Sequence, residues 1–178
     1  MAGSLENRGK LRELIDKFQF IELEKSGFME KNMNITYGIA EESDAEKIYQ
    51  LSKQLIDDYE NIEYINYEKV LSWIREKIQN HIKDYSVIFV DGTKAGYYRF
   101  CKNHDKKFEI DDLYILPQFQ NKGIGSKVIC QCCAEVDEPV MLYVFVKNHR
   151  AVSLYKRLGF EVLKNIKDSR YIMLYNKK

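Results

Sequence analysis

The sequence has almost no excess charge of either sign. Its 178 residues include 28 Lys or Arg and 27 Asp or Glu, so the formal net charge is +1. Proteins that bind DNA or RNA usually carry a clear basic excess that neutralises phosphates. The charge balance therefore argues against a nucleic-acid partner.

Long apolar runs and a secretion signal are also missing. No run approaches the roughly 20 residues that a helix needs to cross a bilayer. The N-terminus has no apolar core followed by small residues at a cleavage site. We therefore expect no membrane partner and a cytoplasmic protein.

Cysteine is too scarce and too clustered for a disulfide framework. The four are Cys101, Cys130, Cys132 and Cys133, and three of them fall within four positions of a helix-like segment. Cys-Gln-Cys-Cys could suggest a metal site, but no second Cys/His pair stands at zinc-ligand spacing. We expect reduced cysteines that pack a helix, and no bound metal.

The chain divides into two regions of different pattern. Residues 1–33 begin with a polar stretch and continue with apolar residues at helical spacing as far as Gly27. This region reads as an N-terminal helical extension or an added leader, and its helix offers a surface for a homodimer. Hydrophobic residues make up 45% of the sequence, enough for the core of one domain over residues 34–178.

The pattern over residues 34–178 predicts alternating strands and helices. Strands are expected at 34–40, 85–90, 93–100, 107–117, 139–148, 161–166 and 169–176, and helices at 43–59, 67–82, 123–136 and 149–158. Ser43 and Glu46 have the spacing of a capping box, Asp91-Gly92 predicts a tight hairpin, and Gly159 predicts a helix end. The order predicts a mixed α/β sheet in one domain.

The segment QNKGIGSKV, residues 120–128, places two glycines at the start of a predicted helix. Glycine inside a helix costs about 1 kcal/mol relative to alanine, so some gain should compensate. Free N–H groups at a helix start bind phosphate, and Gly123 and Gly125 would let it approach, with Lys122 and Ser126 beside it. The segment fits neither a P-loop nor a Rossmann fingerprint, and a plain tight turn stays open as the alternative.

Two motifs in the second half of the chain resemble the GCN5-related N-acetyltransferases, the GNAT family. LYILPQFQNKGIGSKVI resembles the acetyl-CoA-binding segment, whose signature Gln/Arg-x-x-Gly-x-Gly/Ala is matched by Gln120, Gly123 and Gly125. NHRAVSLYKRLGF, residues 148–160, is similar to the second motif of the family. The resemblance covers roughly residues 35–176.

The resemblance implies a fold, a reaction and a co-substrate. The fold would be a single domain with a mixed, mostly antiparallel sheet flanked by helices on both faces. The reaction would be acetyl transfer from acetyl-CoA to an amine, without a metal. The residues implied to contact acetyl-CoA are Leu113, Tyr114, Ile115, Gln120, Asn121, Lys122, Gly123, Ile124, Gly125, Ser126, Asn148 and Ala151.

The same resemblance implies the catalytic groups. Tyr155 would protonate the leaving CoA thiolate, and the alternative is that, as one of 13 tyrosines, it only packs in the core. Glu109 falls where histone-type members carry their base, and Asp111 where some aminoglycoside-type members carry a carboxylate. Strand alternation predicts that Glu109 and Asp111 share a face and that Asp112 lies opposite. The alternative is that all three carboxylates are solvated charges.

The connection between the first two predicted helices, LIDDYENIEYINYE (residues 55–68), interleaves acidic residues with tyrosines. This composition suits a small cationic amine, polyamine- or aminoglycoside-like, through charge pairing and cation–π contacts. A protein lysine or N-terminus is an alternative acceptor, and a solvated loop face is the structural alternative. A non-catalytic acyl-CoA sensor or interaction domain is the alternative of another class.

Overall fold

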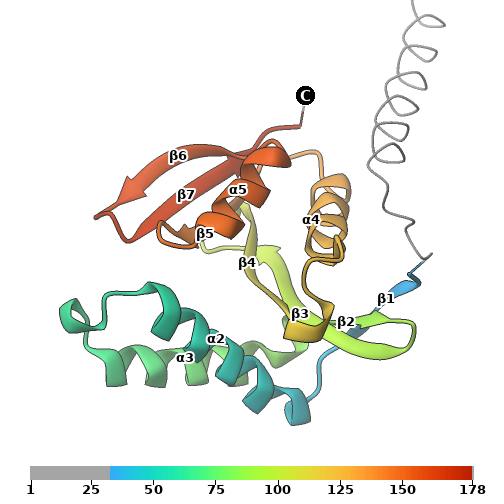
Figure 1. The fold of residues 1–178 in the computed structure, drawn as a ribbon, viewed down its shortest axis with the longest axis horizontal. Coiled ribbons are helices and arrows are strands. Elements are labelled where there is room, and N and C mark those ends of the chain that lie inside the picture. The colour runs from blue at the N-terminus through green and yellow to red at the C-terminus, as the bar shows by residue number, and fades with distance from the viewer. Residues whose placement is uncertain (1–32, 178) are drawn as a thin grey trace, which may run out of the picture. The chain divides into compact units, whose positions relative to one another are not determined.

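The computed structural model describes residues 33–177, which form one seven-stranded sheet with four α-helices (Figure 1). The elements are β1 (Ile35–Ile39), α2 (Ala45–Tyr59), α3 (Tyr67–His81), β2 (Tyr85–Val90), β3 (Thr93–Lys102), β4 (Phe108–Ile115), α4 (Ile124–Ala134), β5 (Val140–Phe145), α5 (His149–Arg157), β6 (Glu161–Ile166) and β7 (Arg170–Tyr175). The predicted order of strands and helices is confirmed. The extension predicted over residues 1–33 lies, apart from Met33, outside the described residues, so the helix and homodimer assigned to it stay predictions.

The sheet has the strand order β1-β2-β3-β4-β5-β7-β6. Strands β4 and β5 pair in parallel, and every other neighbouring pair is antiparallel. The predicted mixed, mostly antiparallel sheet is therefore confirmed. The parallel pair lies in the middle of the sheet, where a crossover through α4 connects β4 to β5.

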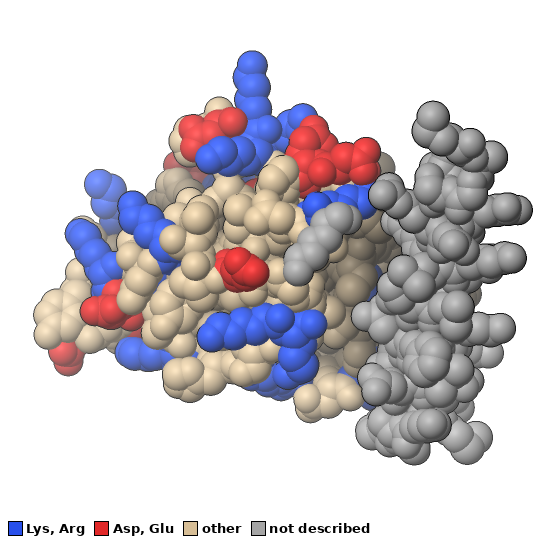
Figure 2. Space-filling view, turned by 90° about the horizontal axis from the view of Figure 1, so that it is seen from above, with Lys and Arg blue, Asp and Glu red and all other residues tan. Residues whose placement is uncertain are grey.

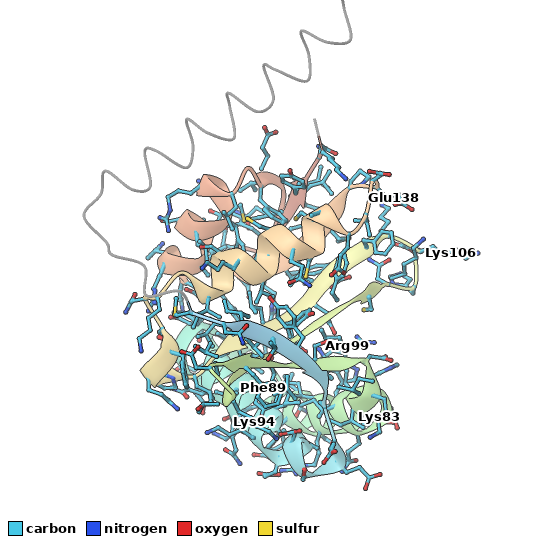
Figure 3. All side chains as sticks on the ribbon, turned by 90° about the vertical axis from the view of Figure 1, so that its right-hand side faces the viewer. Lys83, Phe89, Lys94, Arg99, Lys106 and Glu138 are labelled. Carbon is cyan, nitrogen blue, oxygen red and sulfur yellow. The ribbon has the colours of Figure 1, made fainter. Side chains whose placement is uncertain are left out.

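Helices cover both faces of the sheet. Figure 3 shows α4 above the strands and α2 and α3 below them. Buried apolar residues of α2 and α3, such as Ile48 and Ile78, pack with Tyr97 and Tyr114 of the sheet in one core cluster. On the opposite face α4 buries Val128 and Ile129. Each helix buries one stripe of side chains, as the apolar spacing predicts.

The start of α2 differs from the prediction. The helix begins at Ala45 with Asp44 as its N-cap residue, and no capping box joins Ser43 to Glu46. The reciprocal hydrogen bonds join Glu41 and Asp44 instead, around a short 3₁₀ turn at Glu42–Asp44. Asp44 is favoured there because its buried carboxylate also accepts from Tyr97 on β3 and from Lys94. The tertiary contacts therefore decide between two candidate caps only a few residues apart.

The described residues contain no helix that is both long and apolar enough to span a bilayer.

Candidate active site

Strands β4 and β5 pair over only part of their length. The parallel register runs from Phe108–Val140 to Ile110–Leu142 and ends there. Strand β4 continues to Ile115, and β5 to Phe145. Beyond Ile110, the edge of β4 that faces β5 has no register partner among the described residues. Backbone groups on such an edge can pair with an extended ligand.

A bulge in β4 begins where this pairing ends. Arg99 of β3 pairs with Asp112, and the next residue, Phe100, pairs with Ile110, so Asp111 is an extra residue on β4. A bulge interrupts the alternation of side chains. As a result Asp111 and Asp112 both reach Lys77 of α3. The prediction that Asp112 lies opposite Asp111 is wrong for this reason.

Glu109 is the buried carboxyl group of the three. Its exposed fraction is 8%, and its carboxylate accepts a hydrogen bond of 3.0 Å from Asn103 Nδ2. Burial, helped by the charge of Asp111, raises the pKa of Glu109, although Asn103, Lys77 and Arg99 act in the opposite direction. A carboxyl group with a raised pKa is suited to accept a proton near neutral pH.

Asp111 and Asp112 both take part in ion pairs and hydrogen bonds. Asp111 accepts from Arg99 at 2.7 Å and lies 3.0 Å from Lys77 Nζ. Asp112 accepts from Lys77 at 2.8 Å, from the Tyr85 hydroxyl at 2.5 Å and from the Tyr114 hydroxyl at 2.6 Å. These contacts hold both carboxylates to α3 and β3 by charge-assisted hydrogen bonds.

The glycine loop, residues 120–126, includes the first turn of α4. Gly123 is the N-cap residue with φ of 74°, a left-handed conformation that favours glycine, and a Cβ there would meet nothing within 4 Å. The first helical bond of α4 runs from Lys127 N to Gly123 O. The N–H groups of Ile124, Gly125 and Ser126 therefore precede it, in the first turn, where helices leave N–H groups free. This open, positively polarised turn can accept an anion.

Side-chain contacts fix the glycine loop to its surroundings. The Gln120 amide donates to the Ile115 carbonyl at 2.9 Å, at the end of β4. Arg150 of α5 donates to Gln120 Oε1 at 3.2 Å and to Asn121 Oδ1 at 2.6 Å. Lys122 lies over the ring of Phe119. The loop is thus tied to both β4 and α5, with three cationic or amide side chains around it.

Helix α5 places the second motif beside this loop. Asn148 is its N-cap, and the Asn148 side chain accepts from Ala151 N at 3.1 Å. The helix ends in a Schellman motif, in which Gly159 N donates to Lys156 O and Phe160 N donates to Tyr155 O. Gly159 has the left-handed φ of 90° that the motif requires. The sequence Leu-Gly-Phe is therefore a helix end.

Tyr155 lies in the last turn of α5 and is partly buried. Its ring packs against Phe160, with 5.8 Å between the ring centroids. Burial raises the pKa of Tyr155 to about 12, so the phenol keeps its proton at neutral pH. The residue therefore packs against Phe160 and carries its proton at neutral pH.

Three of the four cysteines lie on α4, whereas Cys101 of β3 pairs in register with Glu109. All four cysteines are free, and Cys132 and Cys133 are buried in α4. Among residues 33–177 no group of three or more His, Cys, Asp or Glu side chains is placed to hold a metal ion.

Comparison with known families decides what the motifs belong to. The model of the acetyltransferase (GNAT) family matches residues 47–160. The chain belongs to the GNAT family of acetyltransferases.

The chain is similar to known acetyltransferases over different shares of its length. The acetyltransferase PseH of Campylobacter jejuni is 28% identical over 124 residues, which are 67% of this chain and 77% of PseH. The thialysine N-epsilon-acetyltransferase of Bos taurus is 33% identical over 79 residues, covering 42% of this chain and 46% of the bovine protein. The PaiA N-acetyltransferase of Thermoplasma acidophilum, solved in complex with coenzyme A, superposes with a TM-score of 0.61 at 22% identity, covering 82% of this chain and all of PaiA.

In this GNAT domain, the α2–α3 connection (residues 60–66) contacts the turn between β6 and β7. Glu60, whose side chain is 7% exposed, forms an ion pair of 2.9 Å with Arg170. The Ser169 hydroxyl donates to the same carboxylate at 2.9 Å. The Arg170 guanidinium also lies over the ring of Phe145, 4.3 Å from its centroid. These contacts join two segments that lie far apart in the sequence.

Sequence reasoning missed the residues that orient these groups. They are Lys77, Arg99, Asn103, Arg150 and Arg170. Their partners are 6 to 110 residues away, and single-sequence patterns carry no signal for such pairs. Arg150 alone had a local signal, since it lies in the first turn of the helix that opens with Asn148.

Proposed function

We propose that this GNAT enzyme transfers the acetyl group of acetyl-CoA to the primary amine of a small cationic molecule, polyamine- or aminoglycoside-like. The observation that carries the proposal is the meeting of three features: the unpaired edge of β4, the open glycine loop and the buried Glu109. Family membership supplies the reaction class and acetyl-CoA as the co-substrate. The choice of acceptor and the role of each residue are proposed.

The residues around the glycine loop fit acetyl-CoA. The diphosphate would lie against the N–H groups of residues 121–126, with Lys122 and Arg150 supplying positive charge. The pantetheine arm would pair with the backbone of Leu113, Tyr114 and Ile115 along the free edge of β4. The open space at Gly123 supports this placement, because a side chain there would occupy the phosphate position. Asn148 and Ala151 would contact the co-substrate from the start of α5.

Glu109 and Tyr155 would handle the two protons of the reaction. Glu109 would take a proton from the amine, directly or through water, and its raised pKa supports that role over Asp111. Tyr155 would donate the proton that the leaving thiolate needs, which its protonated state at neutral pH supports. Acetyl-CoA supplies the thioester carbonyl that the amine attacks.

The acidic residues near the α2–α3 connection support a cationic acceptor. Two of these residues already bind partners within the chain, so the negative charge left for an acceptor is smaller than the sequence suggests. Asp57 is paired with Lys53 and Tyr67, and Glu60 with Arg170. Asp58, Glu63 and Glu68 are exposed and lie close in sequence to the exposed ring of Tyr64. A relative named for acetylating thialysine, the bovine protein, also supports a small amine.

Charge on the surface supports a small acceptor over a nucleic acid. On the face that Figure 2 presents, basic and acidic side chains are interspersed. That face has no field of one sign for a polyanion to follow.

We propose a cytoplasmic enzyme with no membrane partner, and a homodimer formed through residues 1–33. Deleting residues 1–33 and measuring the mass in solution tests the dimer. An unchanged number of chains per particle would exclude it.

The first experiment measures acetyl-CoA affinity by calorimetry, with CoA as competitor, followed by turnover with an amine panel and free-thiol detection. The panel contains polyamines, aminoglycosides, a lysine peptide and a peptide with a free N-terminus. Micromolar binding and turnover of polyamines or aminoglycosides support the proposal. Turnover of the peptides alone would show that the acceptor is a protein lysine or N-terminus and not a small amine. Binding without turnover of any amine would favour the sensor alternative.

A further inference from the structure

The contact between Lys77 and β4 has no role in the function proposed so far. Lys77 projects from α3, next to the buried Ile74 and Ile78 stripe, and its side chain is only 15% exposed. Its ammonium lies 3.0 Å from Asp111 and 2.8 Å from Asp112. It therefore binds the two successive carboxylates that the bulge brings to one side of the strand.

Without a cation beside them, the two carboxylates would destabilise the bulge. Charges on successive residues are normally directed to opposite faces of a strand, whereas here they share one side and are 22% and 13% exposed. Like charges in a partly buried place repel each other, and each pays for lost hydration. A single cation that touches both removes the repulsion and holds the two side chains together.

The surrounding contacts make Lys77 the central member of a network. Arg99, labelled in Figure 3, binds Asp111 from β3, while the hydroxyls of Tyr85 and Tyr114 bind Asp112. The Tyr114 hydroxyl also forms a hydrogen bond of 2.9 Å with the Ser52 hydroxyl of α2. Burial lowers the pKa of Lys77, and the two carboxylates more than offset this, so the pKa is raised and the ammonium stays charged.

The bulge determines the direction of the backbone at the free edge of β4. Asp111 has no register partner on β3, and pairing with β5 has already ended at Ile110. Successive N–H groups on a strand point to opposite edges, so those of residues 111–113 that face away from β3 depend on the shape of the bulge for their direction. These are the groups nearest to the point where a thioester carbonyl would be polarised, if the proposed function holds.

We propose that Lys77 is a positioning residue for acetyl transfer. By holding Asp111 and Asp112 on one side of β4, it fixes the bulge and so directs a backbone N–H at the thioester oxygen. The inference rests on the proposed use of the β4 edge by acetyl-CoA. It gives the two aspartates a structural task and leaves Glu109 as the group that takes the proton.

The test compares Lys77→Met with Lys77→Arg and with the control Lys69→Met. Arginine can still reach two carboxylates, and Lys69 is an exposed lysine of the same helix. We expect Lys77→Met to lower kcat by about 100-fold, as small misplacements of reacting groups do. CoA affinity should change less than about twofold, because the glycine loop is untouched. Lys77→Arg should keep at least about a third of kcat, since its fork can bind both carboxylates.

A binding measurement tests the same idea without turnover. S-ethyl-CoA replaces the thioester carbonyl with a methylene group, so its affinity relative to acetyl-CoA reports the hydrogen bond to that carbonyl. The wild type should prefer acetyl-CoA by about 3- to 10-fold, the range of one net hydrogen bond. Lys77→Met should lose this preference, and Lys69→Met and Lys77→Arg should keep it.

The outcomes separate this proposal from the proposed function. An active enzyme whose Lys77→Met variant keeps both kcat and the preference for acetyl-CoA overturns the positioning role. A wild type without the preference also overturns it, because there is then no N–H to direct. If the wild type has the preference but acetylates no amine, the proposed acceptor fails while the binding ratio still decides the role of Lys77. Should Lys77→Met not fold, the isosteric Asp112→Asn breaks the same pair and is expected to lose the same preference.

Discussion

The glycine loop and the α2–α3 connection are built from contacts of different range. The loop takes its shape from Gly123 and the first turn of α4, within a few residues. The connection is held by Glu60, whose partner Ser169 lies 109 residues further along the chain. The loop offers backbone N–H groups, whereas the connection offers side chains whose charges are partly neutralised by distant partners.

This difference has a consequence for function. A site made of backbone groups keeps its chemistry when side chains change, so it suits a co-substrate shared by a whole family. A site made of side chains on two connecting segments changes with each residue, so it suits selection among acceptors. We therefore expect substitutions in the loop to act on acetyl-CoA affinity, and those in the connection to act on the KM of the amine.

The largest effect on acetyl-CoA binding is expected from Gly123→Glu. The variant places a carboxylate at a left-handed position in front of the first turn of α4, where the phosphate would lie. Acetyl-CoA affinity should fall by at least about 100-fold, or about 2.8 kcal/mol, in calorimetry. The matched control is Gly92→Glu, since Gly92 in the β2–β3 turn also has a positive φ of 78° and open space at its Cβ position. Equal affinities for the two variants would contradict the assignment of the loop.

Tyr155→Phe should separate turnover from binding. Loss of a general acid typically costs about 10²- to 10⁴-fold in rate, so we expect kcat to fall by about 10³-fold. The affinity for acetyl-CoA should stay within about twofold, because a group that acts only on the leaving thiolate contributes to the transition state and not to ground-state binding. Tyr175→Phe is the control, since Tyr175 packs on the same Phe160 ring at 5.5 Å. Unchanged turnover would leave Tyr155 as a packing residue only.

Glu109→Gln should lower kcat while raising stability at neutral pH. The variant keeps the oxygen that accepts from Asn103 but cannot take a proton, so kcat should fall by about 10²-fold. Because burial raises the folded-state pKa of Glu109 above its ordinary value of 4.5, wild-type activity should decline as the pH falls through that raised pKa.

The stability of the fold is expected to change with pH in the opposite direction to the activity. A carboxyl group with a raised folded-state pKa stabilises the fold fully below the unfolded pKa, and this contribution is lost as the pH rises through the folded pKa. Glu109→Gln should therefore have the higher Tm at pH 7, and the difference from wild type should vanish near the ordinary glutamate pKa of 4.5. A lower Tm for the variant at pH 7 would show that the ionised carboxylate stabilises the fold.

The sequence predicts the parts of this molecule that depend on neighbours in the chain. The order of elements, the turn at Gly123 and the end of α5 at Gly159 follow from apolar spacing and from the conformations open to glycine. The cap of α2 was predicted one residue too early, because Asp44 gains contacts from Tyr97 and Lys94 on a strand that the local pattern does not include.

The candidate site was less predictable than the fold. The local pattern over residues 107–117 correctly predicts a strand. The bulge at Asp111, however, inverts the predicted face of every residue that follows it relative to those before it. Its presence depends on β3 and on Lys77, which comes from a helix 35 residues earlier than Asp112. Side-chain pairing across such distances is decided by tertiary packing, and no periodicity in one sequence reports it.

The smallest effect is expected from Arg170→Met, which removes the cation from Glu60 on the acceptor side. Arg170 is 37% exposed, so solvent screens much of the pair, and its loss should cost about 1 kcal/mol and lower Tm by about 2–4 °C. The KM of the amine should rise about threefold, because Glu60 keeps its bond from Ser169 and the connection shifts only slightly. Acetyl-CoA affinity should not change. A loss of acetyl-CoA affinity as large as that of Gly123→Glu would mean that the two regions form one coupled site, and that long-range side-chain contacts also hold the glycine loop.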